Sequence, residues 1–418
     1  MHHPLHPADS TSPVASIVEP PAPLSEADLA ELLPPQRPPR RVARTERAIE
    51  AAGLGDILNK VLAGERLSLD DGLRLSITPH LPLVGYMANI VRERKNGVLT
   101  YFNRNIHVNY TNICNKGCKF CAFQRLPGEE GAYSWSPEEC GDKIREYNHL
   151  PITEVHMVAG INPKITYEQY LRMLREVKQA RPSIHIKAFT MVELAQIHRL
   201  ARKPVQDMIK DLIDAGLGSC PGGGAEIFAD RVHEEIFGKK LDSQGWLDMQ
   251  REVHRAGLNS NATMLYGHIE TAEERVDHLD RLRRLQDETS GFNCFIPLAF
   301  HPENTELAYI PPTSGEMDLR TIAVSRLMLD NFPHIKAYWV MLTPAVAQVA
   351  QSYGADDIDG TIHEEKIYHE AGAKTSQVMT VEELCRLIRE AGRIPVERDT
   401  VYRIIRVMQE EPAAAAVA

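Results

Sequence analysis

The chain has 418 residues, of which 43% are hydrophobic, so it can bury a large core in one large domain or two smaller ones. Its formal net charge of −10, with no basic run, excludes a protein that binds nucleic acid through a basic face. The sequence has no apolar run long enough to span a membrane and no signal peptide at its N-terminus, so we expect no membrane partner.

The first 98 residues divide into a proline-rich segment and a helical one. Residues 1–40 are rich in Pro, His and Ser, and their helix-like fragments are broken by prolines, so we predict disorder there. Residues 41–98 carry apolar side chains at helical spacing, with Ser68 and Asp70 at positions typical of helix caps. We expect this second segment to be a helical lead-in to the main domain.

Residues 99–375 predict one large α/β domain. Short apolar or β-branched runs alternate with amphipathic helices, several of which open with Ser, Thr or Asp and close at Gly. The predicted strands are residues 105–111, 154–159, 184–189, 216–219, 259–266, 293–300, 335–342 and 355–360. Eight alternations over roughly 250 residues are typical of a (β/α)8 barrel. Because the last of these runs is a weak strand, a partial, open barrel is the alternative.

Residues 376–418 form the last predicted segment. Their apolar spacing predicts two further helices, over 380–392 and 397–407. The alanine-rich end of the chain is expected to be a frayed tail.

A cluster of three cysteines follows the first predicted strand. Cys114, Cys118 and Cys121 have the spacing CxxxCxxC, and thiolates are soft ligands suited to iron–sulfur clusters and zinc. Three thiolates on a [4Fe–4S] cluster leave one iron open, which can bind S-adenosylmethionine (SAM). An electron passed through the cluster can then break the adjacent C–S bond and give a 5′-deoxyadenosyl radical. Gly117 permits the tight loop, and Phe120 is placed to pack against the adenine of SAM.

A structural zinc site is the alternative interpretation of these cysteines. Zinc requires four ligands, usually in paired CxxC or CxxH elements, and His107, the nearest further ligand, lies in a predicted strand. The remaining cysteines are isolated in the sequence: Cys140, Cys220, Cys294 and Cys385. The pattern therefore favours the cluster. The odd number of cysteines indicates reduced thiols, and hence a cytoplasmic protein, better than a disulfide framework.

On this motif the sequence resembles the radical SAM superfamily, and four longer blocks extend the resemblance. These blocks, at residues 221–228, 261–271, 295–305 and 335–342, resemble the aminofutalosine synthases of the futalosine route to menaquinone. The resemblance covers about residues 45–405 and implies a [4Fe–4S] cluster and SAM. It also implies a transferase that adds the 5′-deoxyadenosyl radical to the dicarboxylate 3-[(1-carboxyvinyl)oxy]benzoate, giving 6-amino-6-deoxyfutalosine. A flavodoxin or a ferredoxin is the reductant that the resemblance implies.

Two kinds of alternative stay open on the sequence. The cyclic dehypoxanthine futalosine synthases and the deazaflavin-forming synthases share the cysteine loop, although the blocks at 221–226 and 301–304 favour aminofutalosine synthase. A non-catalytic, zinc-stabilised barrel that binds partners is the alternative of another class.

The remaining candidates follow the strands, because residues that act in a barrel lie past the C-terminal ends of its strands. Ala159 and Gly160 resemble the superfamily's turn that contacts the SAM amino group through its backbone. The usual Gly-Gly-Glu is missing here, so a side-chain carboxylate contact at this turn is in question, and an ordinary loop is the alternative. Glu193 is a candidate for the SAM ribose or ammonium, or else a first-turn glutamate favoured by the helix dipole.

Later strand ends supply further candidates. Gly223 lies in a glycine loop that lets backbone approach a ligand, and Glu226 is either a cofactor contact or a helix N-terminal residue. His268 and His301 follow adjacent strands, so we predict them as catalytic donors to a substrate oxygen. Three cations are candidates either for substrate carboxylates or for structural ion pairs: Lys187, Arg326 and Lys336.

Overall fold

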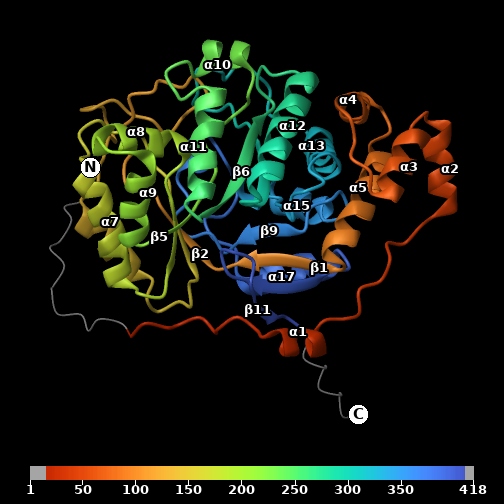
Figure 1. The fold of residues 1–418 in the computed structure, drawn as a ribbon, viewed down its shortest axis with the longest axis horizontal. Coiled ribbons are helices and arrows are strands. Elements are labelled where there is room, and N and C mark those ends of the chain that lie inside the picture. Colours follow the sequence, from red (N-terminus) through yellow and green to blue (C-terminus); the bar gives the residue numbers. More distant parts are fainter. Residues whose placement is uncertain (1–15, 410–418) are drawn as a thin grey trace.

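The computed structural model describes residues 16–409. Residues 1–15 of the predicted disordered segment and 410–418 of the predicted frayed tail lie outside the described residues. Figure 1 shows an α/β domain with helices around a curled sheet, flanked on one side by the N-terminal helices. Within 16–409 no helix is both long and apolar enough to cross a membrane.

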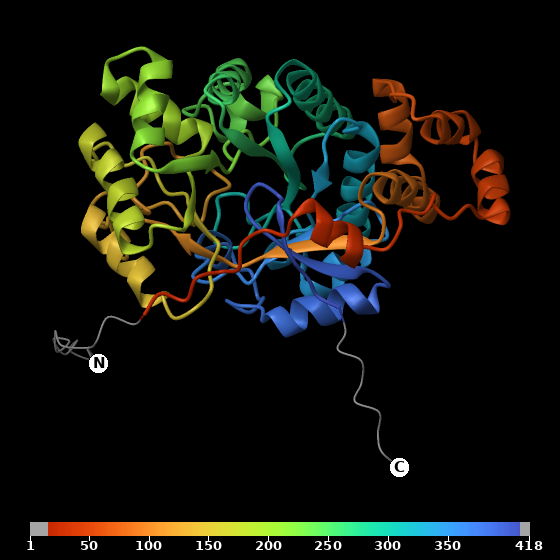
Figure 2. The ribbon, with the colours of Figure 1, turned by 60° about the horizontal axis from the view of Figure 1, so that its bottom comes forward.

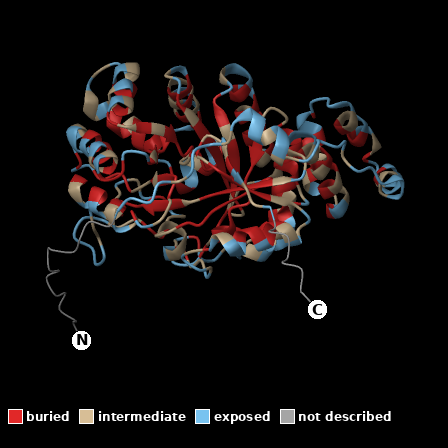
Figure 3. Ribbon diagram, turned by 90° about the horizontal axis from the view of Figure 1, so that it is seen from below, coloured by how far each residue is buried: buried red, intermediate tan, exposed pale blue. Residues whose placement is uncertain are grey.

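Seven parallel strands form the main sheet, in the order β2-β3-β4-β5-β6-β7-β8. Their bounds are Asn105–Val108, Glu154–Met157, His185–Ala188, Leu217–Cys220, Asn259–Tyr266, Phe292–Ala299 and His334–Ile335. Strands that are consecutive in the sequence are neighbours in the sheet. They run parallel, which requires a helical crossover between each pair. Figure 3 shows the result: the strands are buried at the centre, and the outer faces of the surrounding helices are exposed.

A further strand, β9 (Asp357–Gly360), lies between the two edges of this curled sheet. One isolated parallel bridge joins Lys336, just past β8, to Asp357, and another joins Ile106 of β2 to His363. Seven strands thus curl into a half-barrel, and β9 with the residues just after it reaches both edges through single bridges. The predicted α/β barrel class is confirmed, including its weak last strand.

The helices between and after the strands include those that the amphipathic runs predict, together with several short ones that were not predicted. Their bounds are α6 Pro137–Glu146, α7 Tyr167–Ala180, α8 Met191–Ala201, α9 Val205–Asp214, α10 Asp230–Ile236, α11 Ser243–Arg255, α12 Ala272–Thr289, α13 Gly315–Met328, α14 Trp339–Leu342, α15 Pro344–Ala350 and α16 Ile367–Glu370. Four of them begin with reciprocal capping boxes, at Ser136, Thr166, Thr190 and Thr271, which satisfy backbone N–H groups of the first turn. The apolar run at 335–342, predicted as one strand, is not one: only its first residue belongs to β8, and its last four form α14.

The C-terminal segment corrects a prediction. Helix α17 (Val381–Glu390) is present, but the helix predicted over 397–407 is wrong. Strands β10 (Ile394–Arg398) and β11 (Ile404–Val407) form there instead, and with β1 (Leu99–Asn103) and β9 they make a second sheet in the order β11-β10-β1-β9. The reason is tertiary, because β1 offers a free edge on which β10 pairs in parallel from Leu99↔Ile394 to Phe102↔Glu397.

The segment predicted as a helical lead-in contains four helices. They are α2 Ala43–Ala51, α3 Gly55–Ala63, α4 Leu69–Ile77 and α5 Leu81–Asn96. Ser68 caps α4 in a reciprocal capping box with Asp71, whereas Asp70, the other predicted cap, lies in the first turn.

The described part of the predicted disordered segment is not irregular throughout. It contains α1 (Glu26–Leu32), and Figure 2 shows the chain before and after α1 running along the domain toward α2. The backbone N–H of Val18 donates to Asn148 over 2.8 Å, and that of Leu24 donates to Ile404 over 2.7 Å. These bonds fix a segment whose composition alone predicts disorder, so for residues 16–40 that prediction is wrong.

Candidate active site

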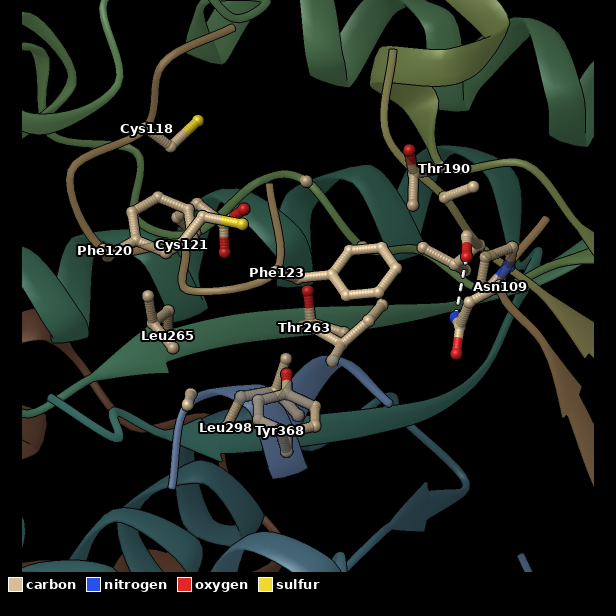
Figure 4. Close-up of a pocket in the computed structure, with 18 of the residues that line it drawn as sticks. Asn109, Cys118, Phe120, Cys121, Phe123, Thr190, Thr263, Leu265, Leu298 and Tyr368 are labelled. Atoms are coloured by element: carbon tan, nitrogen blue, oxygen red, sulfur yellow. Dashed lines mark hydrogen bonds between the residues drawn. The ribbon is translucent and has the colours of Figure 1, made fainter. Parts of the chain in front are cut away.

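A cavity of about 270 Å³ lies at the carboxyl ends of the main-sheet strands. The cysteine loop lies at one side of the cavity, with Asn109 and Thr190 across from it, as Figure 4 shows. Apolar side chains from three strand ends, those of β3, β6 and β7, form much of the wall: Val158, Leu265, Leu298 and Phe300. Enclosure by such side chains keeps water away from a bound ligand.

The loop after β2 brings its three cysteines to this cavity. Cys114, Cys118 and Cys121 all line it, and the Cys121 N–H donates to the Cys118 carbonyl over 3.1 Å. Gly117 has a φ of 63°, a left-handed conformation that glycine adopts without steric cost. Burial raises the pKa of the Cys118 thiol to about 12, so this sulfur becomes a thiolate at neutral pH only with a partner such as a metal.

The donor set around the cavity fits an iron–sulfur cluster better than a single ion. Within residues 16–409 no group of three His, Cys, Asp or Glu side chains is arranged to hold one metal ion. A four-iron cluster demands a wider arrangement, since each thiolate binds a separate iron. Three thiols spread along one loop around a shared cavity meet that demand. The other four cysteines do not line the cavity, so one iron would lack a protein ligand.

An ion pair lies beside the cysteine loop. Glu226 and Lys240 both line the cavity, and the Lys240 ammonium contacts the Glu226 carboxylate. Burial alone would lower the pKa of Lys240, but Glu226 and the Cys118 sulfur more than offset this, so the pKa is raised. The ammonium lies 5.4 Å from the ring centroid of Phe120, which also lines the cavity. Glu226 is therefore brought to the predicted place, while the sequence offered no signal for Lys240, which precedes α11 without a motif.

Glu193 lies behind the turn at Ala159 and Gly160 and does not line the cavity. Its fully buried carboxylate accepts hydrogen bonds from the Tyr110 hydroxyl at 2.7 Å and from the Ala159 N–H at 3.2 Å. The Thr190 N–H and hydroxyl donate to it at 2.7 and 2.8 Å. Ala159 and Gly160 do line the cavity. The geometry therefore gives Glu193 the task of fixing the turn rather than touching a ligand.

The glycine loop after β5 approaches the neighbouring strand very closely. A Cβ on Gly222 would lie 1.7 Å from the carbonyl oxygen of Asn261 in β6, so no larger residue fits. The next two glycines line the cavity with their backbone, and the Trp246 indole donates to the Gly223 carbonyl over 3.1 Å. Gly223 is thus where the sequence places it.

The two predicted catalytic histidines have different positions. His301 lines the cavity and its Nε2 lies 3.0 Å from the Met341 carbonyl. The His268 side chain is fully buried and is not part of the lining. Its Nδ1 accepts from the Ile269 N–H at 2.8 Å and its Nε2 lies 3.1 Å from the Leu265 carbonyl. Burial lowers its pKa, so a neutral imidazole here fixes a turn.

The floor of the cavity carries two histidines that were not predicted as catalytic or ligand-binding residues, although His107 was considered as a zinc ligand. His107 of β2 and His156 of β3 face each other in register, and both line the cavity. The signal was present in the alternation of the strands, because residues 105, 107 and 109 share one face. It could not be used without knowing which face points inward.

Buried ion pairs lie beneath and beside this floor. Lys187 is 2.8 Å from Glu154, and Lys336 is 3.0 Å from Asp359. Arg326 pairs with Asp356, and both side chains are fully buried. The three cations that the sequence offered as carboxylate partners are therefore all engaged in structural pairs.

Comparisons with known proteins agree with this geometry. The radical SAM superfamily matches residues 108–282, and the CofH/MqnC C-terminal region matches residues 289–411. Methylornithine synthase shares the fold with a TM-score of 0.65 at 16% identity, covering 81% of this chain and 97% of that one. Fold, cysteine loop and family match define a radical SAM enzyme, a class that uses a [4Fe–4S] cluster and SAM.

More similar relatives narrow the class. The aminodeoxyfutalosine synthase of Thermus thermophilus is 51% identical over 365 residues, which is 86% of this chain and 98% of the relative. That of Streptomyces coelicolor is 42% identical over 362 residues, 84% of this chain and 94% of the relative. A cyclic dehypoxanthine futalosine synthase of Halalkalibacterium halodurans is 36% identical, covering 86% of this chain and 96% of that protein. The chain belongs to the family of the aminodeoxyfutalosine synthases, which confirms the resemblance of the four sequence blocks.

Proposed function

We propose that the protein joins the 5′-deoxyadenosyl group of SAM to the enol-ether double bond of 3-[(1-carboxyvinyl)oxy]benzoate. The radical formed by this addition rearranges onto the aromatic ring, and loss of the enol carboxylate then gives 6-amino-6-deoxyfutalosine. One observation carries the proposal: a loop of three thiols faces an enclosed, largely apolar cavity in a chain 51% identical to an aminodeoxyfutalosine synthase. The chain is more similar to the two aminodeoxyfutalosine synthases than to the cyclic dehypoxanthine futalosine synthase, and this favours addition over hydrogen abstraction.

The chain's own residues supply ligands, position and exclusion of water. Cys114, Cys118 and Cys121 would hold the [4Fe–4S] cluster, which when bound supplies the electron that cleaves SAM. The backbone at Ala159 and Gly160, held by Glu193, would orient SAM. The apolar walls suit an aromatic substrate and keep water from a primary carbon radical. Holding the two reactants together in this cavity can contribute about 7–11 kcal/mol to lowering the barrier.

A reductant and a location complete the proposal. Flavodoxin or ferredoxin would deliver the electron, and the reduced cysteines favour a cytoplasmic enzyme. Turnover with reduced flavodoxin in place of dithionite tests the first part. A protein that turns over with dithionite but with neither electron carrier would contradict it.

The deciding experiment is anaerobic turnover followed by mass spectrometry. Reconstituted enzyme with SAM, dithionite and the enol-ether benzoate is expected to give an adduct that contains the adenosyl mass. Cys118→Ala is expected to lose the adduct and most cluster iron, whereas Cys385→Ala, a buried cysteine of α17 outside the cavity, keeps both. Free 5′-deoxyadenosine with unchanged benzoate, or full turnover by Cys118→Ala, would refute the proposal.

A further inference from the structure

Two buried imidazoles at the cavity floor have unused hydrogen-bonding capacity. The ring centroids of His107 and His156 are 4.6 Å apart at an interplanar angle of 53°. In the described chain, the Nε2 atoms of both rings are buried and have no hydrogen-bond partner. Buried polar atoms in folded proteins are nearly always paired, so two orphans side by side in a ligand cavity indicate a partner that is absent here.

The neighbouring carboxylates already have hydrogen-bond partners. Asp359 lines the cavity too, but it accepts from Lys336 at 3.0 Å and from Asn105 at 3.1 Å. Glu365 accepts from the Tyr368 N–H at 3.0 Å and lies 2.8 Å from the His369 Nδ1. The two imidazoles thus remain as donors whose hydrogen bonds are not used.

Burial favours the neutral form of these imidazoles. The pKa of His107 is lowered and that of His156 is well below its ordinary value, with burial the largest cause in both. Glu154, Asp359 and, for His107, Glu365 raise the pKa, whereas Lys187 lowers it and His107 lowers that of its neighbour. A neutral imidazole carries one N–H donor, so the pair offers two donors to one bridging acceptor.

We propose that His107 and His156 together bind the benzoate carboxylate of the substrate and so set its depth in the cavity. An ionised carboxylate is an acceptor with two oxygens, which matches two adjacent N–H donors. The cysteine loop lies at the other end of the cavity, so the double bond must face that end. The aromatic ring then packs against Leu265 and Leu298, which are neighbours on β6 and β7, and its carboxylate points to the floor. This inference rests on the proposed function and names the positioning residues for it.

The test compares two substrates that differ only in this carboxylate. The wild-type enzyme is expected to prefer 3-[(1-carboxyvinyl)oxy]benzoate over 2-phenoxyacrylate in kcat/KM. His107→Leu and His156→Leu are each expected to lower kcat/KM for the dicarboxylate about 10–100-fold, mainly through KM, because a hydrogen bond to a charged group is lost. Turnover of 2-phenoxyacrylate is expected to stay nearly unchanged. His107→Gln, which keeps an N–H donor, restores much of the preference, and the exposed His80→Leu leaves it intact.

Each contrary result has a distinct meaning. A purely structural role would lower turnover of both substrates equally, which overturns the inference while leaving the proposed function standing. Absence of any adduct from the wild-type enzyme overturns the proposed function and the inference with it. If the leucine variants do not fold, inhibition of the wild-type enzyme decides: 3-methoxybenzoate should inhibit at least about tenfold more strongly than 3-methoxybenzamide. Equal inhibition by the two overturns the carboxylate subsite.

Discussion

The buried carboxylate of Glu193 allows a sharp test of how the turn at Ala159 and Gly160 is held. Each of its two oxygens accepts two hydrogen bonds, one oxygen from Tyr110 and Ala159 and the other from the Thr190 backbone and hydroxyl. Glu193→Gln keeps the size of the side chain but replaces one oxygen with an NH2 group. That group faces two donors and cannot accept from either. The substitution therefore isolates the hydrogen bonding from the packing.

The size of the loss follows from the number of bonds. A hydrogen bond to a charged group contributes about 1.5–3 kcal/mol, and two such bonds are lost in a buried site, so we expect about 3–5 kcal/mol of unfolding free energy. Glu383 is the matched control, because it occupies the same position of a capping box, behind Thr380, but is exposed and lacks the tertiary donors. Glu383→Gln should cost less than about 1 kcal/mol.

Urea denaturation of cluster-free protein, followed by circular dichroism, measures both changes. Equal m-values for the variants keep the comparison valid. The Glu193 variant should also show a raised KM for SAM, since the Ala159 N–H loses its anchor. If the two substitutions change the unfolding free energy by the same amount, Glu193 is only a helix cap and the argument fails.

Two further substitutions test the interior. Lys187→Met leaves Glu154 buried without its partner at 2.8 Å and should cost about 3–5 kcal/mol in urea denaturation, partly recovered by adding Glu154→Gln; a change under 1 kcal/mol would contradict this. Gly222→Ala forces a Cβ against the Asn261 carbonyl and should abolish both stable folding and cluster binding. Gly257→Ala, also at positive φ but with nothing within 4 Å, should cost only about 1 kcal/mol, so equal losses at the two sites would refute the steric argument.

The sequence predicts the strands of the main sheet well because each is a short apolar run between capped helices. Prediction from the sequence fails where pairing between distant segments decides the secondary structure. Residues 397–407 have apolar spacing compatible with a helix, yet the free edge of β1 draws 394–398 into a parallel strand. The run at 335–342 has the composition of a strand throughout, but only its start has a partner in β7. Propensity is a weak prior against such long-range contacts.

The residues of the site likewise divide into those predictable from local spacing and those whose role depends on tertiary contacts. Cys114, Cys118 and Cys121 were predictable because their spacing within one loop carries the chemistry. His268 and Glu193 were placed correctly at strand ends, but a strand end does not say whether a side chain turns into the cavity or beneath it. Both turn beneath and hold backbone. Burial and partner geometry, which the sequence does not encode locally, separate a ligand contact from its support.

Along strand β3 the inward side chains change from charged to apolar toward the mouth of the cavity. Residues two apart on a strand share one face, so Glu154, His156 and Val158 stand one above another toward the cavity mouth. They run from an ion pair with Lys187, through an unpartnered imidazole, to an apolar wall, and the turn at Gly160 follows. The same order suits a carbon radical, which must react among apolar groups while the charge of its substrate is bound elsewhere. On the proposed function, a polar substitution at Val158 would admit water beside the radical, whereas one at the floor would weaken substrate binding.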